Sequence, residues 1–496
     1  MSINKNSTSF ENVDKLIKHL NLLYDQEIHR IQDAFEAFKQ GKKLKKRVRG
    51  FYPYVEITVE ETKHSSHKRS YGFLRDSGTY RMTVTRPNLY KDYYKEQFGL
   101  LLKNHKMPIT VGLSDEPIPV HFAYPTGIKV DDSFDSDRYQ ELGNFFDLPD
   151  LKYIDDQVVN GRGHYMDSTD MPLSFFSAPR VDFSLHRLQH YTATNPEHFQ
   201  NFVLYTNYQF YIDEFVALAK ALMQKTDDPE LLEISQQYTH FVEPGNNITF
   251  NQNLSGKVDE GEIVKRLPQM PAYHLCTKDH MGITMVNMGV GPSNAKTITD
   301  HVAVLRSCAW IMLGHCAGLR SSQNLGDYVL AHGYVREDHV LDDDLPLTVP
   351  LPPLAEIQIA LQQAVSEVTQ KPDWEVKKVM RTGTVVTVDN RNWETNPNNI
   401  LIEAFNQSRA IALDMESATI AGNGFRYRVP YGTLLCVSDK PLHGELKLAG
   451  MANEFYKYQV DQHLKIGVRT MEILRNLGKH KLHSRKLRGF LEPPLQ

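Results

Sequence analysis

Two acidic residues near the C-terminal end of the chain each follow an apolar segment. The segment Ala410–Leu413 runs into Asp-Met-Glu at residues 414–416, and the segment Tyr431–Val437 runs into Ser-Asp at residues 438–439. Such runs are typical of strands in a parallel sheet covered on both faces, whose ligands bind beyond the carboxyl ends. We therefore expect Glu416 and Asp439 to face one crevice. One carboxylate would hold sugar hydroxyls, and the other, when protonated, would donate its proton to a leaving base.

Two glycine-containing loops also follow apolar segments. The first has Gly289, Gly291 and Ser293 in the order G-V-G-P-S before an expected helix, and the second begins with Gly314 and His315. Glycine lets the backbone approach a ligand closely, and a helix N-terminus favours an anion. The alternative for the first loop is a plain tight turn in which Ser293 or Asn294 caps the helix. For His315 a structural role and a role in the site stay equally open.

The order of these motifs resembles the purine nucleoside phosphorylase superfamily and, over nearly the whole chain, the AMP nucleosidase family. In that superfamily the pair equivalent to Met415 and Glu416 holds the ribose, and the acid equivalent to Asp439 protonates the purine. Both glycine loops then line the anomeric carbon. The segments that carry the resemblance are RVDFSLHRLQHYT, FVLYTNYQFYIDEF, NMGVGPSNAKT, GHCAGLR, RTGTVVTVDNRNWE, DMESA, VSDKP and LHSRKLR.

The resemblance implies hydrolysis of AMP to adenine and ribose 5-phosphate, without a metal or cofactor in the chemistry. It further implies activation by MgATP, inhibition by phosphate and a homohexamer. Two departures argue against phosphate as a co-substrate: the G-V-G-P-S loop is one residue short of the usual pattern, and the apolar segment Ala309–Leu313 lacks an expected Arg. The alternatives are a purine nucleoside phosphorylase and a non-catalytic adenine-nucleotide sensor.

The base and the 5′-phosphate of AMP need further residues. Trp393 either stacks on the purine or belongs to the core or to an interface, and Ser438 is a second candidate for the base pocket. Arginine is the usual partner of a phosphate, and lysine and histidine near Asp439 can assist it. The candidates for the 5′-phosphate site are Arg180, Arg187, Arg409, Lys440, His443, Arg485 and Arg488.

Composition narrows the class of protein. The 496 residues are too many for one core, and a hydrophobic content of 41% belongs to a folded protein. A formal charge of −4 gives no support for a nucleic-acid binder. The four cysteines have neither metal-ligand spacing nor the density of a disulfide framework, which fits a reducing compartment. Without an apolar signal segment or a run of about 20 apolar residues, we expect a cytoplasmic protein that binds no membrane.

The expected elements form two domains. Residues 1–179 are predicted to form an α+β regulatory domain with a helix from Phe10 to Gly41. Residues 180–496 are predicted to form a phosphorylase-type α/β domain, in which helices flank a mainly parallel or mixed sheet. We expect a helix over Phe199–Met223 within this second domain. The basic run Lys42–Arg49 is either a solvated connector, which is favoured, or a site for a phosphate-bearing effector.

Overall fold

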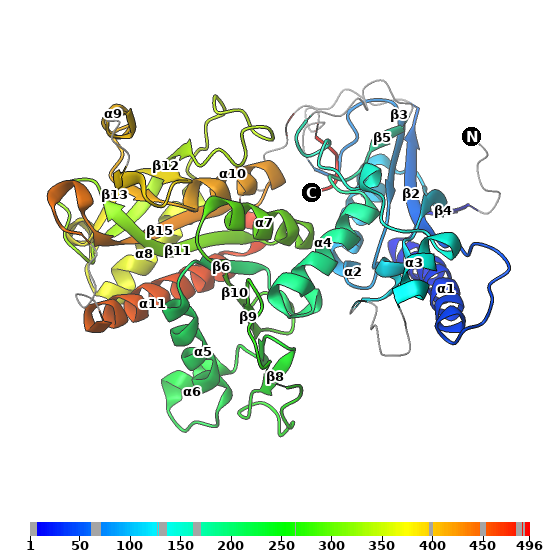
Figure 1. The fold of residues 1–496 in the computed structure, drawn as a ribbon, viewed down its shortest axis with the longest axis horizontal. Coiled ribbons are helices and arrows are strands. Elements are labelled where there is room, and N and C mark those ends of the chain that lie inside the picture. Colours follow the sequence, from blue (N-terminus) through cyan, green and yellow to red (C-terminus); the bar gives the residue numbers. More distant parts are fainter. Residues whose placement is uncertain are drawn as a thin grey trace. The chain divides into compact units, whose positions relative to one another are not determined.

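The chain forms two compact units, and each has its own sheet (Figure 1). Unit 1 comprises Met1–Arg187 with Lys486–Gln496, and unit 2 comprises Leu188–Arg485. The expected division after residue 179 falls in the first turn of helix α4 (Ala178–Thr192) and stays a prediction. The computed structural model describes residues 7–60, 71–125, 127, 136–161, 170–262, 264–395, 400–446, 453–482, 489 and 492–496.

Unit 1 contains a five-stranded sheet in the order β1-β4-β2-β3-β5, antiparallel except for the β3–β5 pair. Helix α1 (Val13–Lys39) packs against β2 and β4 with an apolar face that includes the buried Leu20 and Ile31. The Asn12 side chain accepts a hydrogen bond from the Lys15 amide at 3.0 Å, so the helix begins at Val13 rather than at Phe10. The other elements are β1 (Thr8–Phe10), β2 (Phe51–Val59), β3 (Gly78–Thr83), β4 (Ile109–Pro117), β5 (Asp170–Pro172), α2 (Lys91–His105) and α3 (Ser136–Phe145).

Unit 2 contains a ten-stranded mixed sheet flanked by helices, as the sequence predicts. Its strand order is β14-β13-β12-β15-β11-β6-β10-β9-β7-β8. Figure 1 shows α7 and α10 on one face of the sheet and α8 and α11 on the other. The strands are β6 (Phe202–Thr206), β7 (His240–Glu243), β8 (Asn247–Phe250), β9 (Ala272–Cys276), β10 (Ile283–Asn287), β11 (Ala309–Gly318), β12 (Tyr328–Glu337), β13 (Met380–Val388), β14 (Ala412–Asp414) and β15 (Tyr431–Asp439). The helices are α5 (Gln209–Met223), α6 (Pro229–Ser235), α7 (Pro292–Val302), α8 (Ala355–Thr369), α9 (Ile400–Gln407), α10 (Ser417–Tyr427) and α11 (Asn453–Leu477).

The expected helix over Phe199–Met223 is wrong in its first part. Residues Phe202–Thr206 form strand β6, which lies between β10 and β11, and the helix begins only at Gln209. All five residues of the strand are buried. A short run of apolar residues lacks the alternation of apolar and polar positions that identifies a half-exposed strand, so a buried strand and a buried helix look alike in it. Here the run also adjoins a true helical pattern. The correction matters because β6 brings one more polar residue to the strand ends.

Within the described ranges, no helix is both long enough and apolar enough to span a bilayer.

Candidate active site

The carboxyl ends of four neighbouring strands meet at one edge of the unit 2 sheet. Strands β10, β6, β11 and β15 run parallel to one another. Asn207 and the Gly289–Gly291 loop follow β6 and β10, Asp439 ends β15, and His315 lies in the C-terminal half of β11. Strand β14 runs antiparallel to β11, and Ala317 of β11 is paired with β14 on one side and with Asp439 on the other. The two acid-bearing segments therefore flank the same strand.

Glu416 is the most enclosed acid of this group, with only 1% of its surface exposed. Its Oε1 accepts a hydrogen bond from the Gly291 amide at 2.6 Å, and its Oε2 accepts one from Asn207 Nδ2 at 2.9 Å. The residue stands at the N-cap position of α10, yet its side chain makes no capping bond there. The alternative role for an acid at this position is only to stabilise the helix start through the helix dipole. These contacts argue against that alternative, because the carboxylate points to the segments that follow two other strands.

Asp414 lies beside Glu416 and fixes the start of α10. Its Oδ1 accepts from Thr387 Oγ1 at 2.6 Å, and its Oδ2 accepts from the amide and the hydroxyl of Ser417. Burial, followed by the negative charge of Asp414, raises the pKa of Glu416 above that of an ordinary glutamate. Burial likewise raises the pKa of Asp414. Two buried carboxyl groups that hold protons toward neutral pH are typical of a catalytic site rather than of a surface.

Asp439 ends strand β15 and is only half-buried. The Ser438 hydroxyl donates to Asp439 Oδ1 at 2.6 Å and also lies 3.4 Å from the Cys316 carbonyl oxygen. The next residue, Lys440, is buried, and its Nζ lies 2.7 Å from a Glu445 carboxylate oxygen. Asp439 is therefore held in a defined position by its neighbour, while the adjacent cation is paired with a different acid.

Trp393 and Met415 lie in one apolar cluster near the ends of β13 and β14. The indole is 8% exposed and packs edge-on against Phe405 with 5.7 Å between the ring centroids. Leu413 belongs to the same cluster, so the cluster directly adjoins the acidic segment that begins at residue 414. The described contacts of Trp393 are those of a core residue, and its role in stacking on a base stays a prediction.

The two glycine loops differ in what their glycines do. Gly289 and Gly291 have φ angles of 73° and 112°, a region that favours glycine, and Gly291 is the N-cap of α7. Ser293 lies in the first turn of α7, where its carbonyl accepts from the Thr297 hydroxyl at 2.8 Å. Gly314 has no positive φ, and a Cβ there would lie 2.8 Å from Met312 Cε, the end of a flexible side chain that can move aside.

His315 follows Gly314 in β11 and is surrounded by tyrosines. Its ring lies edge-on to Tyr208, with 4.9 Å between the centroids, and 5.6 Å from the ring of Tyr211. Both tyrosines come from the segment that follows β6. His315 thus lies near the strand ends, and a packing role and a role in the site both remain compatible with this position.

The described contacts do not bring the candidates for the 5′-phosphate site together at one place. Arg180 belongs to unit 1, where it pairs with Asp156 at 2.9 Å, and the Arg187 guanidinium lies over the Phe183 ring. In unit 2, Arg409 and His443 are exposed, and Lys440 is paired as described above. Arg485 and Arg488 lie outside the described residues. The 5′-phosphate site stays a prediction.

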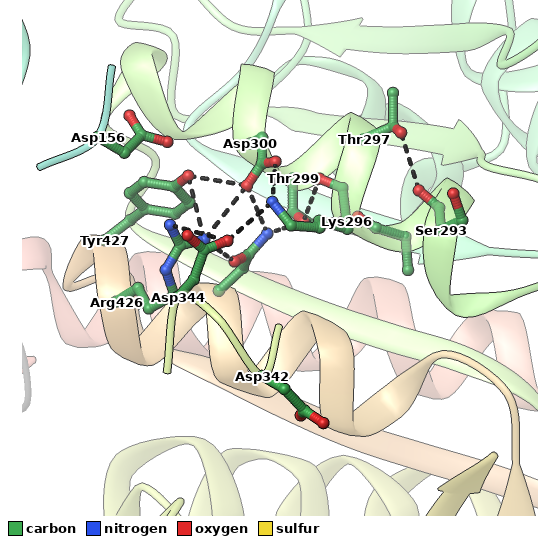
Figure 2. A network of polar contacts seen from close by, with 12 residues as sticks. Asp156, Ser293, Lys296, Thr297, Thr299, Asp300, Asp342, Asp344, Arg426 and Tyr427 are labelled. Carbon is green, nitrogen blue, oxygen red and sulfur yellow. Dashed lines mark hydrogen bonds and ion pairs between the residues drawn. The ribbon is translucent and has the colours of Figure 1, made fainter. Parts of the chain in front are cut away.

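A charged network joins the two helices that begin at this site (Figure 2). Arg426 of α10, with a side chain 2% exposed, lies 3.4 Å from Asp300 of α7 and 3.7 Å from Asp344. Lys296 of α7 reaches the same two acids at 2.8 and 3.2 Å. The Tyr427 hydroxyl donates to Asp300 at 2.8 Å. Because Gly291 is the N-cap of α7 and Glu416 is the N-cap of α10, the network helps to fix the relative position of these two residues.

We expect Arg426→Met to destabilise the protein, but by less than the roughly 3–5 kcal/mol of a fully uncompensated buried charge, because Lys296 still reaches both acids. The thermal unfolding midpoint should fall clearly, and activity should fall with it as the Gly291–Glu416 contact loosens. The matched control is Lys465→Met on α11, whose ion pair with Asp461 is 58% and 39% exposed. An exposed pair contributes little. Equal unfolding midpoints in the two variants would show that the network does not hold the helices together.

The sequence did not reveal Asn207 and Asp414 as members of this site. Asn207 follows β6, for which the sequence pattern predicts a helix, although a polar residue after a short buried run is a usable signal. Asp414 stands next to Met415 and Glu416 in the sequence, but its effect on Glu416 depends on burial of both groups. A sequence motif does not show how deeply two neighbouring acids are buried.

Known families and proteins are similar to this chain over most of its length. Residues 15–170 match the family model described as the N-terminus of bacterial AMP nucleoside phosphorylase, and residues 257–464 match the phosphorylase superfamily. AMP nucleosidase of Escherichia coli K12 is 45% identical over 484 residues, which cover 96% of this chain and 97% of that protein. The AMP nucleosidase of Escherichia coli O157:H7 gives the same values.

Two solved structures are also similar. AMP nucleosidase from Bacteroides thetaiotaomicron has a TM-score of 0.42 and 26% identity, covering 60% of this chain and 97% of its own. Purine nucleoside phosphorylase from Toxoplasma gondii has a TM-score of 0.41 and 16% identity, covering 58% and 97%. The level and extent of identity to the Escherichia coli proteins decide the assignment: the chain belongs to the AMP nucleosidase family.

Proposed function

We propose that this chain hydrolyses the N-glycosidic bond of AMP and releases adenine and ribose 5-phosphate. The observation that carries the proposal is the buried Glu416, held between two strand ends beside a strand that also pairs with Asp439. Its membership of the AMP nucleosidase family, whose Escherichia coli members are named for this activity, supplies the substrate.

The two acids have different tasks in this reaction. Breaking the glycosidic bond leaves positive charge on the sugar and negative charge on the base. Asp439 in its acid form donates a proton to the purine, which lowers the barrier for its departure. Glu416 accepts hydrogen bonds from the ribose hydroxyls, and its charge stabilises the positive sugar. Water then attacks the anomeric carbon.

Phosphorolysis is the weaker alternative. The segment Ala309–Leu313 of β11 is buried and apolar, so it offers no cation to a phosphate nucleophile. The Gly291 amide, at the loop where an anion was expected, donates to Glu416 instead. A loop amide already engaged with a carboxylate is poorly suited to bind a second anion.

The function is tested by measuring free adenine after incubation with AMP and, separately, with adenosine. We expect release from AMP and far slower release from adenosine, because the 5′-phosphate contributes to binding. Equal release from adenosine would favour a nucleoside enzyme, and absence of release from both would favour a nucleotide sensor.

The proposal extends to the regulation of the enzyme and to its assembly. We place the response to MgATP and phosphate in unit 1, since a separate family model covers residues 15–170 and the strand-end acids all lie in unit 2. An effector acts at a distance only if it prefers one of two arrangements of the protein. A homohexamer is the assembly that the resemblance implies, and the cytoplasm is the compartment that the cysteine pattern favours. The chemistry itself requires no metal or cofactor.

The basic run Lys42–Arg49 is partly tied to unit 1. Arg47 donates to the Phe146 carbonyl at 2.9 Å, and Arg47 and Arg49 each lie 3.4 Å from Asp147. Lys45 and Lys46 are exposed. Arginines that share one acid of the same unit favour the connector interpretation over an effector site.

We therefore expect the double variant Lys45→Gln and Lys46→Gln to keep the full response to ATP. The measurement is the AMP concentration that gives half-maximal rate, with and without MgATP, in the double variant and in the wild type. A variant with normal basal activity that no longer responds to ATP would instead identify the run as part of the effector site.

A further inference from the structure

Asn207 lies at the carboxyl end of a central strand of the unit 2 sheet. It follows β6, which lies between β10 and β11, and its Nδ2 lies 2.9 Å from Glu416 Oε2. In its ionised form Glu416 only accepts hydrogen bonds, so the Asn207 amide nitrogen faces the carboxylate and the amide oxygen faces away. The orientation of the side chain is therefore set by the acid.

The amide oxygen of Asn207 is shielded from solvent and has no hydrogen-bond partner among the described residues. A Cβ added to Gly314 would lie 3.6 Å from it, which places the oxygen against β11 beside the residue that precedes His315. A buried acceptor without a donor costs about 1–3 kcal/mol. Such atoms are rare in native proteins and call for an explanation, which at a binding site is a donor on the ligand.

We propose that Asn207 belongs to the active site: its amide nitrogen aims the Glu416 carboxylate, and its amide oxygen accepts a hydrogen bond from an O–H group at the reacting end of the sugar. This inference rests on the proposed hydrolysis of AMP. Two sources can supply the O–H group, namely a ribose hydroxyl and the attacking water. Each Glu416 oxygen keeps a lone pair beyond its contact with Gly291 or Asn207, so both acceptors can serve the same ligand.

The attacking water fits the chemistry as follows. Its oxygen forms a bond to the anomeric carbon while the bond from that carbon to the purine nitrogen breaks. The electron pair of the broken bond leaves with the adenine, which receives a proton from Asp439. The proton lost by the water passes to the Glu416 carboxylate and returns through solvent to Asp439. A ribose hydroxyl at the same place would orient the sugar without changing any bond.

Asn207→Ala tests the role, with Asn207→Asp as an isosteric second variant. We expect kcat/KM for AMP to fall roughly 10–100-fold in the alanine variant, as for loss of hydrogen bonds to a charged group. The bond from Asn207 lowers the pKa of Glu416, so the acid limb of the pH profile should move to higher pH. It should move further in the aspartate variant, where a second negative charge faces Glu416. A merely structural role would reduce activity without moving this limb.

Asn201→Ala is the matched control, because Asn201 precedes the other end of β6 and its amide contacts Met281 Sδ at 3.5 Å. It should leave both the rate and the pH profile unchanged. Deoxy analogues of AMP separate the two sources of the O–H group. If a ribose hydroxyl is the partner, the preference for AMP over its 2′- or 3′-deoxy analogue narrows in Asn207→Ala. If water is the partner, the preference stays and the rate falls for all substrates.

Measuring adenine release by the wild type distinguishes a failure of this inference from a failure of the proposed function. A wild type that does not act on AMP overturns the function. A wild type that acts on AMP, together with alanine and aspartate variants of unchanged rate and pH profile, overturns the role of Asn207 alone. Variants that unfold at lower temperature but keep the acid limb of the wild type also overturn it, since they show a structural residue.

Discussion

Asp439→Asn is expected to lower the turnover of AMP by ~10²–10⁴ and to leave KM nearly unchanged. The amide has the shape of the carboxyl group and can keep the contact with the Ser438 hydroxyl, which now donates to the amide oxygen. It cannot supply the acidic proton that the departing purine needs. Steady-state kinetics of adenine release at saturating and limiting AMP measure the two quantities separately.

Asp461→Asn provides the control for this variant, because it removes a carboxylate from the exposed ion pair on α11. It should retain wild-type kinetics. Near-normal turnover in Asp439→Asn would remove Asp439 from the mechanism, whereas a large rise in KM alone would make it a binding residue.

Glu416→Gln is expected to reduce kcat by roughly 10²–10³-fold, the cost of losing one well-placed electrostatic contact to the transition state. The substitution removes the negative charge of the side chain and keeps its volume. The raised pKa of Glu416 means that the carboxylate forms only at a pH above the ordinary glutamate range. Wild-type kcat/KM should therefore rise with pH through that raised value, and the rise should vanish in the glutamine variant.

Folding stability gives an internal control for Glu416→Gln. A carboxyl group whose pKa is raised in the folded state costs stability as pH increases from its unfolded pKa to its folded pKa. At alkaline pH the glutamine variant should therefore be at least as stable as the wild type. A stable variant with unaffected rate and equal use of 2′-deoxy-AMP would return Glu416 to the role of a helix-start residue.

The parts of this site that could be predicted from sequence are those that follow strong local patterns. Asp439 and Glu416 each come after an apolar run, and the order of the surrounding motifs is specific. Asn207 was missed because β6 is short, continuously apolar and next to a helix, so its pattern was assigned to the wrong element. Resolving that error required the pairing of β6 with β10 and β11.

Electrostatic properties of the site depend on contacts that no motif contains. The pKa of Glu416 reflects its burial and the position of Asp414, and the network around Arg426 joins residues from three separate segments. The 5′-phosphate candidates illustrate the reverse case: arginines were easy to find by type, but Arg180 turned out to be paired within unit 1. Residue type predicts what a side chain can do, and the fold decides where it does it.

The most direct measurement is ³¹P NMR of AMP turnover by the full chain, in buffer without phosphate and in buffer with excess phosphate. Hydrolysis predicts ribose 5-phosphate as the phosphorylated product in both samples, formed without consumption of phosphate. Formation of ribose 1,5-bisphosphate, with turnover only when phosphate is present, would contradict hydrolysis and identify the enzyme as a phosphorylase.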